Sequence, residues 1–82
     1  MAVRLLNLTI TRVDQAVFNG EVVSVVVPGA GGIMEILAHH QALISPLKAG
    51  VIKIKNTDST IEEIKINNGT LEISHNHATI LI

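Results

Sequence analysis

The sequence contains no cysteine, tryptophan or tyrosine, and Phe18 is its only aromatic residue. Without cysteine, no disulfide can stabilise the fold, which suits a reducing compartment. A chain of this length buries only about 60% of the surface that its unfolded state exposes, so its stability depends on apolar packing. Hydrophobic residues make up 48% of the 82 residues. In the absence of aromatics they must form an aliphatic core.

Charge is also scarce, with six basic and seven acidic residues and a formal net charge of −1. A nucleic-acid-binding protein usually needs a basic stripe and aromatic side chains for stacking, and the sequence has neither. No apolar run approaches the roughly 20 residues of a membrane-spanning helix, and no signal-peptide pattern opens the chain. We therefore expect a soluble protein with no nucleic-acid partner.

Short runs of alternating apolar and polar residues occupy most of the chain. In residues 6–11 the alternation places Leu6, Leu8 and Ile10 on one face of a strand, and residues 51–55 do the same for Ile52 and Ile54. β-Branched residues, which favour strands, dominate these runs. Turn signals separate the runs at intervals of about 8–12 residues. The pattern predicts an all-β sandwich or barrel with little or no helix.

Three stretches predict turns, and a fourth predicts a central strand. Residues 17–20 end in Asn-Gly, residues 67–69 read Asn-Asn-Gly and residues 75–77 read His-Asn-His; all three are typical of turns. Residues 21–27 hold five valines, which predicts a central strand that is covered on both faces and closed by Pro28.

The stretch of residues 28–50 departs most from this strand pattern. It holds four of the six glycines, both prolines and two adjacent histidines. We interpret it as the segment on which a partner docks. Within it, Ile33 and Met34 leave two alternatives open: they fold back over the core, or they form an exposed apolar contact.

Three residue groups could suggest a metal site, a phosphate-binding loop or a pair of catalytic carboxylates, but the expected positions of the residues do not suit any of these sites. Adjacent strand residues such as His39 and His40 point to opposite faces, and no third ligand follows His77, so neither histidine pair suits a metal ion. The glycines of residues 29–32 are not followed by a helix or lysine, as a phosphate-binding loop requires. Glu62 and Glu63 face opposite sides of a strand and cannot act as paired carboxylates. We expect no catalytic group, cofactor or metal.

Five motifs occur in one order along the chain: Phe18-x-Gly20-Glu21-Val22, Pro28-Gly29-x-Gly31-Gly32, Ile36-Leu37-x-x-His40, Leu43-Ile44-Ser45-x-Leu47-Lys48-x-Gly50 and Asn68-Gly69-x-Leu71-Glu72-Ile73. With these motifs the chain, from about Leu6 to Ile82, resembles the N-terminal domain of the epsilon subunit of F-type ATP synthases, which is called delta in mitochondria. The resemblance implies a flattened β-sandwich of about ten short strands.

The resemblance also implies a function. This domain is a non-catalytic rotor part of the central stalk, which couples the gamma subunit to the membrane c-ring during ion-driven ATP synthesis. It implies a gamma interface at Arg12, His40 and Ser45, and a c-ring interface at Ile33, Met34 and Glu35. It places the protein on the cytoplasmic side of the ion-translocating membrane, held there only through the complex.

Family members usually continue past the last strand into a two-helix hairpin. This chain ends at Ile82, as a naturally short member or as a piece of a longer chain would. We expect the former, with a single domain over residues 1–82 and no hairpin. Two hypotheses outside the family are a small β-sandwich adaptor with another partner, and a cupin-like metal-dependent enzyme suggested only by the two histidine pairs.

Overall fold

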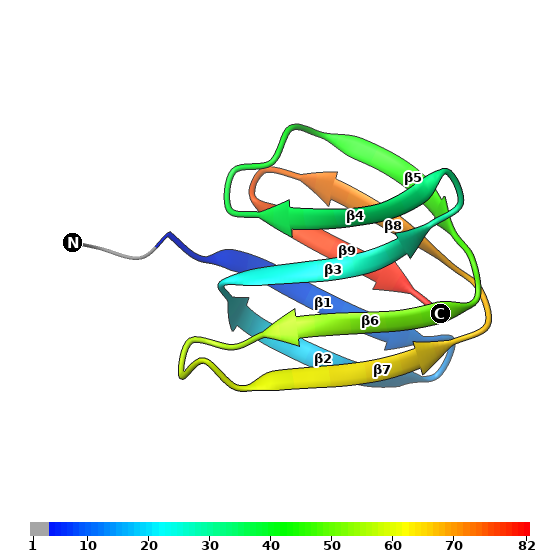
Figure 1. Ribbon diagram of the computed structural model, residues 1–82, viewed down its shortest axis with the longest axis horizontal. Coiled ribbons are helices and arrows are strands. Elements are labelled where there is room, and N and C mark those ends of the chain that lie inside the picture. Colours follow the sequence, from blue (N-terminus) through cyan, green and yellow to red (C-terminus); the bar gives the residue numbers. More distant parts are fainter. Residues whose placement is uncertain (1–3) are drawn as a thin grey trace.

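The computed structural model describes residues 4–82, which form nine β-strands (Figure 1). The strands are β1 (Leu6–Arg12), β2 (Gln15–Val22), β3 (Ser24–Gly29), β4 (Gly32–Leu37), β5 (Leu43–Leu47), β6 (Gly50–Lys55), β7 (Ile61–Ile66), β8 (Gly69–Ser74) and β9 (His77–Leu81). The all-β prediction is confirmed, with nine strands where about ten were expected. Residues 4–82 contain no helix that is long and apolar enough to cross a bilayer.

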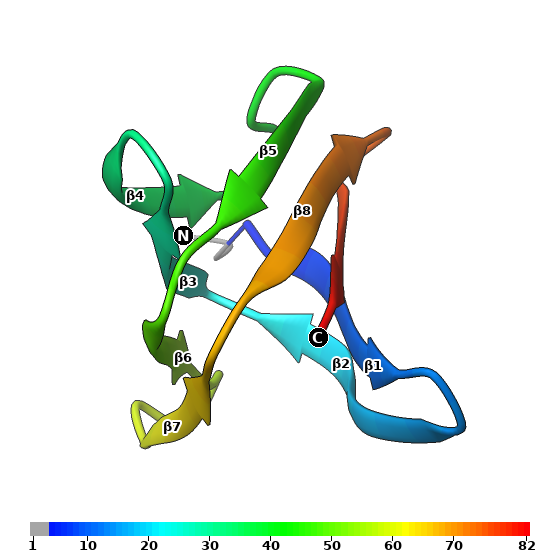
Figure 2. The ribbon, with the colours of Figure 1, turned by 90° about the vertical axis from the view of Figure 1, so that its right-hand side faces the viewer.

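The strands form one sheet that curls into two facing layers. The strand order is β2-β1-β9-β8-β5-β3-β6-β7, and β4 pairs with the free side of β3. Figure 1 shows β4, β3, β6 and β7 in front of β1, β2, β8 and β9, and Figure 2 shows the two layers from one end. We call β4-β3-β6-β7 the front layer and β2-β1-β9-β8-β5 the back layer.

The layers join where β3 meets β5. Gly29 pairs with Leu47, the N–H of Ala30 donates to Pro46 O (3.0 Å), and the N–H of Lys48 donates to Pro28 O (2.9 Å). Elsewhere the β5 edge facing away from β8 has no strand partner in the described residues. These few bonds at one corner join the two layers into one sheet.

An aliphatic core fills the space between the layers. Alternate residues of each strand point inward, and Leu6, Leu8, Ile10, Ile52 and Ile54 are all fully buried, as the alternation predicted. The remaining core residues are Val22, Val25, Val27, Ile36, Leu47, Ile66, Leu71, Ile73, Ala78 and Ile80. Interiors of this kind pack at the density of organic crystals, so the two layers form a stiff unit.

Two of the predicted connections are wrong. Asn19 and Gly20 lie inside β2, where they pair with Thr9 and Leu8 of β1, and they do not turn the chain. The side chain of Asn19 faces outward and accepts a hydrogen bond from the Thr9 hydroxyl (3.3 Å). A polar residue on an exposed strand face is as acceptable as one in a turn, and the local sequence does not separate the two.

The second of these connections is Asn67-Asn68-Gly69, which connects two strands as predicted but does not form a tight hairpin turn. This segment carries the chain from β7 in the front layer to β8 in the back layer, and these strands pair with other partners. Gly69 is required by a close approach: a Cβ there would lie 2.7 Å from Leu81 O and 3.2 Å from Ile82 Cγ2. Glycine is therefore needed at this position for tight packing and not for a hairpin turn.

The valine-rich stretch serves two strands. β2 ends at Val22 and β3 begins at Ser24, so the chain passes between the layers at Val23, whose N–H donates to Lys55 O (2.9 Å). β3 also continues through Pro28, which pairs with Ile33. The predicted central strand covered on both faces is therefore confirmed for β3, but it begins at Ser24, not at Glu21, and Pro28 does not close it.

The predicted His-Asn-His turn is confirmed. His75 and Asn76 connect β8 to β9 with φ values of 51° and 59°. Two consecutive residues with positive φ are the requirement of a type I′ hairpin turn, and asparagine tolerates that conformation better than most residues.

Candidate partner-binding surfaces

The loop between β4 and β5 carries both histidines of the docking segment, and a single side chain fixes its shape. His39 has a φ of 61°, in the left-handed region, and its N–H donates to Oδ1 of Asn76 (2.8 Å). The Nδ2 of Asn76 donates to Leu5 O (2.9 Å), and its backbone carbonyl accepts from the N–H of Asn7 (3.2 Å). Asn76 thus ties the β4–β5 loop to the start of β1.

His40 is half-buried beside this anchor. Its Nδ1 lies 2.9 Å from Gln41 O. Because a carbonyl oxygen can only accept, Nδ1 must carry the proton of this hydrogen bond. In neutral His40 the other ring nitrogen, Nε2, is then an acceptor, so the ring can receive a hydrogen bond from a donor on a partner.

Ser45 lies on β5, on the same strand face as Leu43 and the buried Leu47, and is half-buried. It pairs with Leu71 of β8, and its hydroxyl donates to Pro46 O (3.1 Å). The hydroxyl oxygen still has room to accept a hydrogen bond at the free edge of β5.

The three predicted ring-facing residues do not share one surface. Ile33 is 77% exposed and Glu35 is exposed, and both point outward from β4. Met34 points inward, packs against the core, and has its Cε 2.8 Å from the position of a Cβ on Gly29. The two alternatives for Ile33 and Met34 therefore both occur, one for each residue.

A shallow apolar hollow of about 370 Å³ lies beside Ile33 on the outer face of the front layer. Its walls include Val26, Pro28 and Val51, with Lys48 and Lys53 as its charged members. Gly50 lines it too, and a side chain would not fit there because its Cβ would lie only 2.8 Å from Pro28 Cβ. The exposed Ile33 and this hollow form one continuous apolar area.

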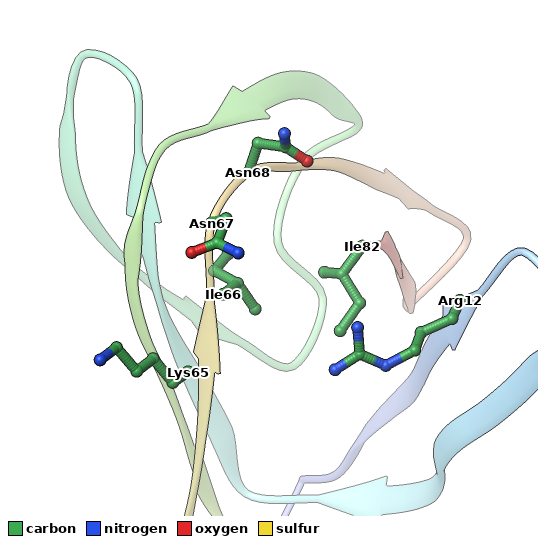
Figure 3. A pocket seen from close by; sticks show the side chains of 6 residues that line it. All are labelled: Arg12, Lys65, Ile66, Asn67, Asn68 and Ile82. Carbon is green, nitrogen blue, oxygen red and sulfur yellow. The ribbon is translucent and has the colours of Figure 1, made fainter.

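Arg12 is separated from His40. It ends β1, whereas the Asn76 anchor of the His40 loop lies at the start of β1, a strand length of about 20 Å away. Arg12 instead lines a polar pocket of about 230 Å³ with Lys65, Ile66, Asn67, Asn68 and Ile82 (Figure 3). We call this the end pocket. The guanidinium points into it, toward Ile66 and Ile82 (Figure 3).

None of the alternative chemical sites gains support from the geometry. Residues 4–82 contain no group of three or more histidine or acidic side chains that could hold a metal ion. Ala30 and Gly31 form the turn of a β-hairpin that runs directly into β4, so no helix N-terminus follows these glycines. Glu62 accepts a hydrogen bond from Asn56 (2.9 Å) and Glu63 pairs with Lys53 on β6.

Two features of these surfaces were not predicted. The sequence pattern places Asn76 only in a turn, yet this residue anchors the His39–His40 loop, and His39 lies 37 positions away in the chain. The end pocket joins residues from β1, the β7–β8 crossover and the last strand. Neither the Asn76 anchor nor the end pocket depends on a local sequence pattern. For the end pocket, the one indication in the sequence is the Asn-Asn-Gly motif of residues 67–69, which predicts a turn there.

Comparison with known proteins identifies the fold. Residues 5–82 match the protein family described as "ATP synthase, Delta/Epsilon chain, beta-sandwich domain". This chain belongs to that family. The β4–β5 loop, the Ile33 surface and the end pocket are therefore features of a delta/epsilon-type β-sandwich, and the two hypotheses outside the family no longer apply.

Curated relatives agree with this assignment. The chain is 45% identical over 74 residues to the ATP synthase epsilon chain of Protochlamydia amoebophila, covering 90% of this chain and 50% of the relative. It is 38% identical over 77 residues to that of Sulfurimonas denitrificans, covering 94% and 59%. The chain thus spans about half to three-fifths of the length of these relatives.

Solved structures share the fold. A chain in the Euglena gracilis mitochondrial ATP synthase structure, titled as OSCP/F1/c-ring in rotational state 1, superposes with a TM-score of 0.87 at 19% identity, covering 99% of this chain and 51% of that one. A chain from the central stalk/c-ring structure of the Tetrahymena thermophila mitochondrial ATP synthase gives a TM-score of 0.79 at 15% identity, covering 92% and 60%.

Proposed function

We propose that this chain is a non-catalytic rotor part of an F-type ATP synthase, which couples the gamma subunit to the c-ring in the central stalk. The match of residues 5–82 to the delta/epsilon β-sandwich family carries this proposal. The curated relatives are named epsilon chains, and the titles of two structures with the same fold name the c-ring, one of them with the central stalk.

The packing suits a mechanical role. A rotor part must pass torque from one neighbour to the other without deforming. The core of fully buried aliphatic side chains extends between both layers, and close-packed interiors have low compressibility. The β3–β5 corner further limits how far the two layers can slide past one another.

We assign the c-ring contact to the outward side of β4. Ile33 and Glu35 supply an exposed apolar and an acidic side chain, and the partly buried Met34 supports this strand from inside. The hollow beside Ile33 can receive an apolar side chain of a partner loop.

We assign gamma to His40, Ser45 and Arg12. Because Arg12 and the His40 loop lie at opposite ends of the sandwich, gamma must extend along about 20 Å of it to contact both. Attachment to the membrane is then peripheral, through the ring, and on its cytoplasmic side.

Binding to purified gamma subunit from the same organism tests this proposal. We expect a complex with a dissociation constant of about 1 μM or tighter. Ile33→Glu should leave gamma binding unchanged and abolish retention on membranes that carry the c-ring, because a buried apolar contact would then hold an unpaired charge. If the wild-type chain forms no complex with gamma at micromolar concentration, the proposal is wrong.

A further inference from the structure

We infer that the free edge of β5 binds an extended segment of a partner protein as an added β-strand; on the proposed function, on which this assignment rests, that partner is the gamma subunit. On one side, β5 pairs with β8 through all five of its residues (Figure 2). On the other side, only Leu47 pairs with another strand of the described residues, at the β3 corner. The rest of this side is an open sheet edge.

Hydrogen bonds at the β3 corner show how the backbone of β5 is oriented. Pro46 O accepts from the Ala30 N–H (3.0 Å), and the Lys48 N–H donates to Pro28 O (2.9 Å). The backbone groups of Pro46 and Lys48 are therefore directed away from β8, toward β3. In an antiparallel ladder this direction alternates from one residue to the next, so the two bonds define it for the whole strand.

Ile44 is the residue whose backbone groups face the open edge. It lies two positions before Pro46, so its N–H and C=O are also directed away from β8. Leu43 and Ser45 direct theirs toward β8, with which both residues pair. No strand of residues 4–82 pairs with Ile44 on the outer side. Ile44 thus offers one donor and one acceptor to a strand that adds to this edge.

The open edge is short. Pro46 has no N–H, and its carbonyl is already bonded to Ala30, so an added strand cannot extend far past Ser45. At the other end, the β4–β5 loop precedes Leu43. A partner segment of about three residues therefore fits, and it would exchange two hydrogen bonds with Ile44.

β5 also lacks the charges that protect the other free edges of the sheet. Natural edge strands are usually blocked by charged side chains, which discourage pairing with another chain. The other free edge strands carry such residues: Glu21 on β2, Glu35 on β4, and Glu62, Glu63 and Lys65 on β7. β5 reads Leu-Ile-Ser-Pro-Leu, and its Ile44 is 70% exposed. An uncharged, apolar edge of this kind suits a permanent strand partner.

The side chains around Ile44 indicate the chemistry of the added strand. A residue paired with Ile44 would place its side chain on the same face, beside the exposed isoleucine. The residues before and after it would point inward, next to Leu43 and Ser45. Leu43 is half-buried and packs against the core, so an apolar side chain beside it would extend the core over the edge. We therefore expect an uncharged segment with at least one apolar residue.

The position of the edge favours gamma over the c-ring. Ile44 lies between His40 and Ser45, the two residues of this region that we assign to gamma. The c-ring contact that we assign to Ile33 lies on β4 in the front layer, whereas β5 belongs to the back layer. A strand added at Ile44 would form one continuous contact with the His40 loop.

Amide hydrogen exchange of the wild-type chain tests this inference, followed by NMR in the free chain and in its complex with purified gamma subunit. In the free chain we expect the Ile44 N–H to exchange quickly and the N–H groups of Leu43 and Ser45, which face β8, to be protected. Binding of gamma should slow exchange at Ile44 at least about tenfold.

Each other outcome has a distinct meaning. Unchanged exchange at Ile44 in a complex with gamma would overturn the added strand and leave the proposed function standing. Protection of Ile44 that rises with the concentration of the free chain would show that a second copy occupies the edge, which overturns the assignment to gamma. If the wild-type chain does not bind gamma, the proposed function fails first.

Two variants of Ile44 separate its backbone from its side chain. Ile44→Pro removes the outward N–H without removing a bond to β8, and Ile44→Thr is the matched control because it keeps the N–H and a β-branched side chain. We expect Ile44→Pro to weaken the gamma complex at least about tenfold, since an acceptor of the partner is left unpaired. Ile44→Thr should stay within about threefold of wild type.

Circular dichroism checks that both variants fold. Equal losses of gamma affinity in the two folded variants would show that the side chain and not the backbone binds, which overturns the added strand. If Ile44→Pro does not fold, the exchange measurement on the wild-type chain decides.

Discussion

The N–H of His39 donates a hydrogen bond of 2.8 Å to the side chain of Asn76, two residues that are 37 positions apart in the chain. Through the same amide, Asn76 also holds Leu5 O (2.9 Å), so one half-buried side chain connects the β4–β5 loop, the β8–β9 turn and the start of β1. The loop held in this way carries His40, the residue that we assign to the gamma contact.

Asn76→Gly and Asn76→Ala separate the two roles of this residue. Glycine keeps the φ of 59° without strain but loses two hydrogen bonds, which we expect to lower the free energy of unfolding by about 1–3 kcal/mol. Alanine should cost about 1 kcal/mol more, because its Cβ disfavours the left-handed conformation. Urea unfolding of both variants measures this difference. Equal stability of the glycine variant and the wild type would show that the amide contributes nothing.

Gly69→Ala tests the close approach of the β7–β8 crossover to the last strand. The new Cβ would lie 2.7 Å from the backbone carbonyl of Leu81, which cannot move without breaking the sheet. We expect a loss of about 1–3 kcal/mol in the free energy of unfolding. Gly31→Ala is the matched control, because a Cβ there meets nothing within 4 Å and the change should stay within about 0.5 kcal/mol. A neutral Gly69→Ala would contradict the packing described for this crossover.

Ile33 and Ile36 on β4 form a matched pair with opposite environments. Ile36 is fully buried, so Ile36→Ala should destabilise the fold by about 2–5 kcal/mol through lost burial and a cavity. Ile33 is 77% exposed, and Ile33→Ala should change stability by no more than about 0.5 kcal/mol while weakening c-ring binding. Thermal unfolding and a membrane-retention assay report the two effects. A large stability loss in Ile33→Ala would mean that this side chain serves the core and not a partner.

The alternation of apolar and polar residues predicted the core, because successive side chains of a strand point to opposite faces and only one face is buried. Leu6, Leu8 and Ile10 all became buried on one face, and Ile33 and Met34 were divided between surface and core by the same rule. The sequence could not distinguish Asn19-Gly20 inside a strand from Asn-Gly in a turn. The difference lies in pairing with β1, which is a long-range contact.

The candidate gamma interface was predicted only in part, because its arrangement also depends on long-range contacts. The family resemblance predicts separately that Arg12, His40 and Ser45 each face gamma, and it does not predict how these three residues lie relative to one another. The separation of Arg12 from the His40 loop follows from β1 running from the Asn76 anchor to the end pocket, which no local pattern encodes. The end pocket needs three segments that are distant in sequence, so only the tertiary structure brings its lining residues together.

The β6–β7 loop contains Asp58, a carboxylate whose pKa is lowered in the folded state. The Thr60 hydroxyl donates to Asp58 Oδ1, and this bond, with a second from the Thr60 N–H, lowers the pKa of Asp58 below its ordinary value of 3.8. A lowered pKa in the folded state stabilises the loop at pH values above 3.8, and this contribution is lost as the pH falls through the folded-state pKa.

Thr60→Val removes the hydroxyl bond and keeps the backbone bond. We expect the pKa of Asp58, followed by NMR titration of its carboxyl carbon, to rise toward the ordinary value in this variant. Ser59→Ala is the control, because the shift has no contribution from the Ser59 side chain. An unchanged Asp58 titration in Thr60→Val would show that the hydroxyl is not the cause.

Cross-linking in the assembled synthase tests the rotor assignment most directly. Cysteine is introduced at Ile33 and, separately, at His40 in this cysteine-free chain, and each variant is assembled with the synthase of the same organism before a short cross-linker is added. We predict that Ile33→Cys links to the c-ring, that His40→Cys links to gamma, and that neither link stops ATP hydrolysis, because all three parts rotate together. Cross-links from either position to the alpha or beta subunits, or loss of hydrolysis when gamma or the ring is linked, would contradict the assignment.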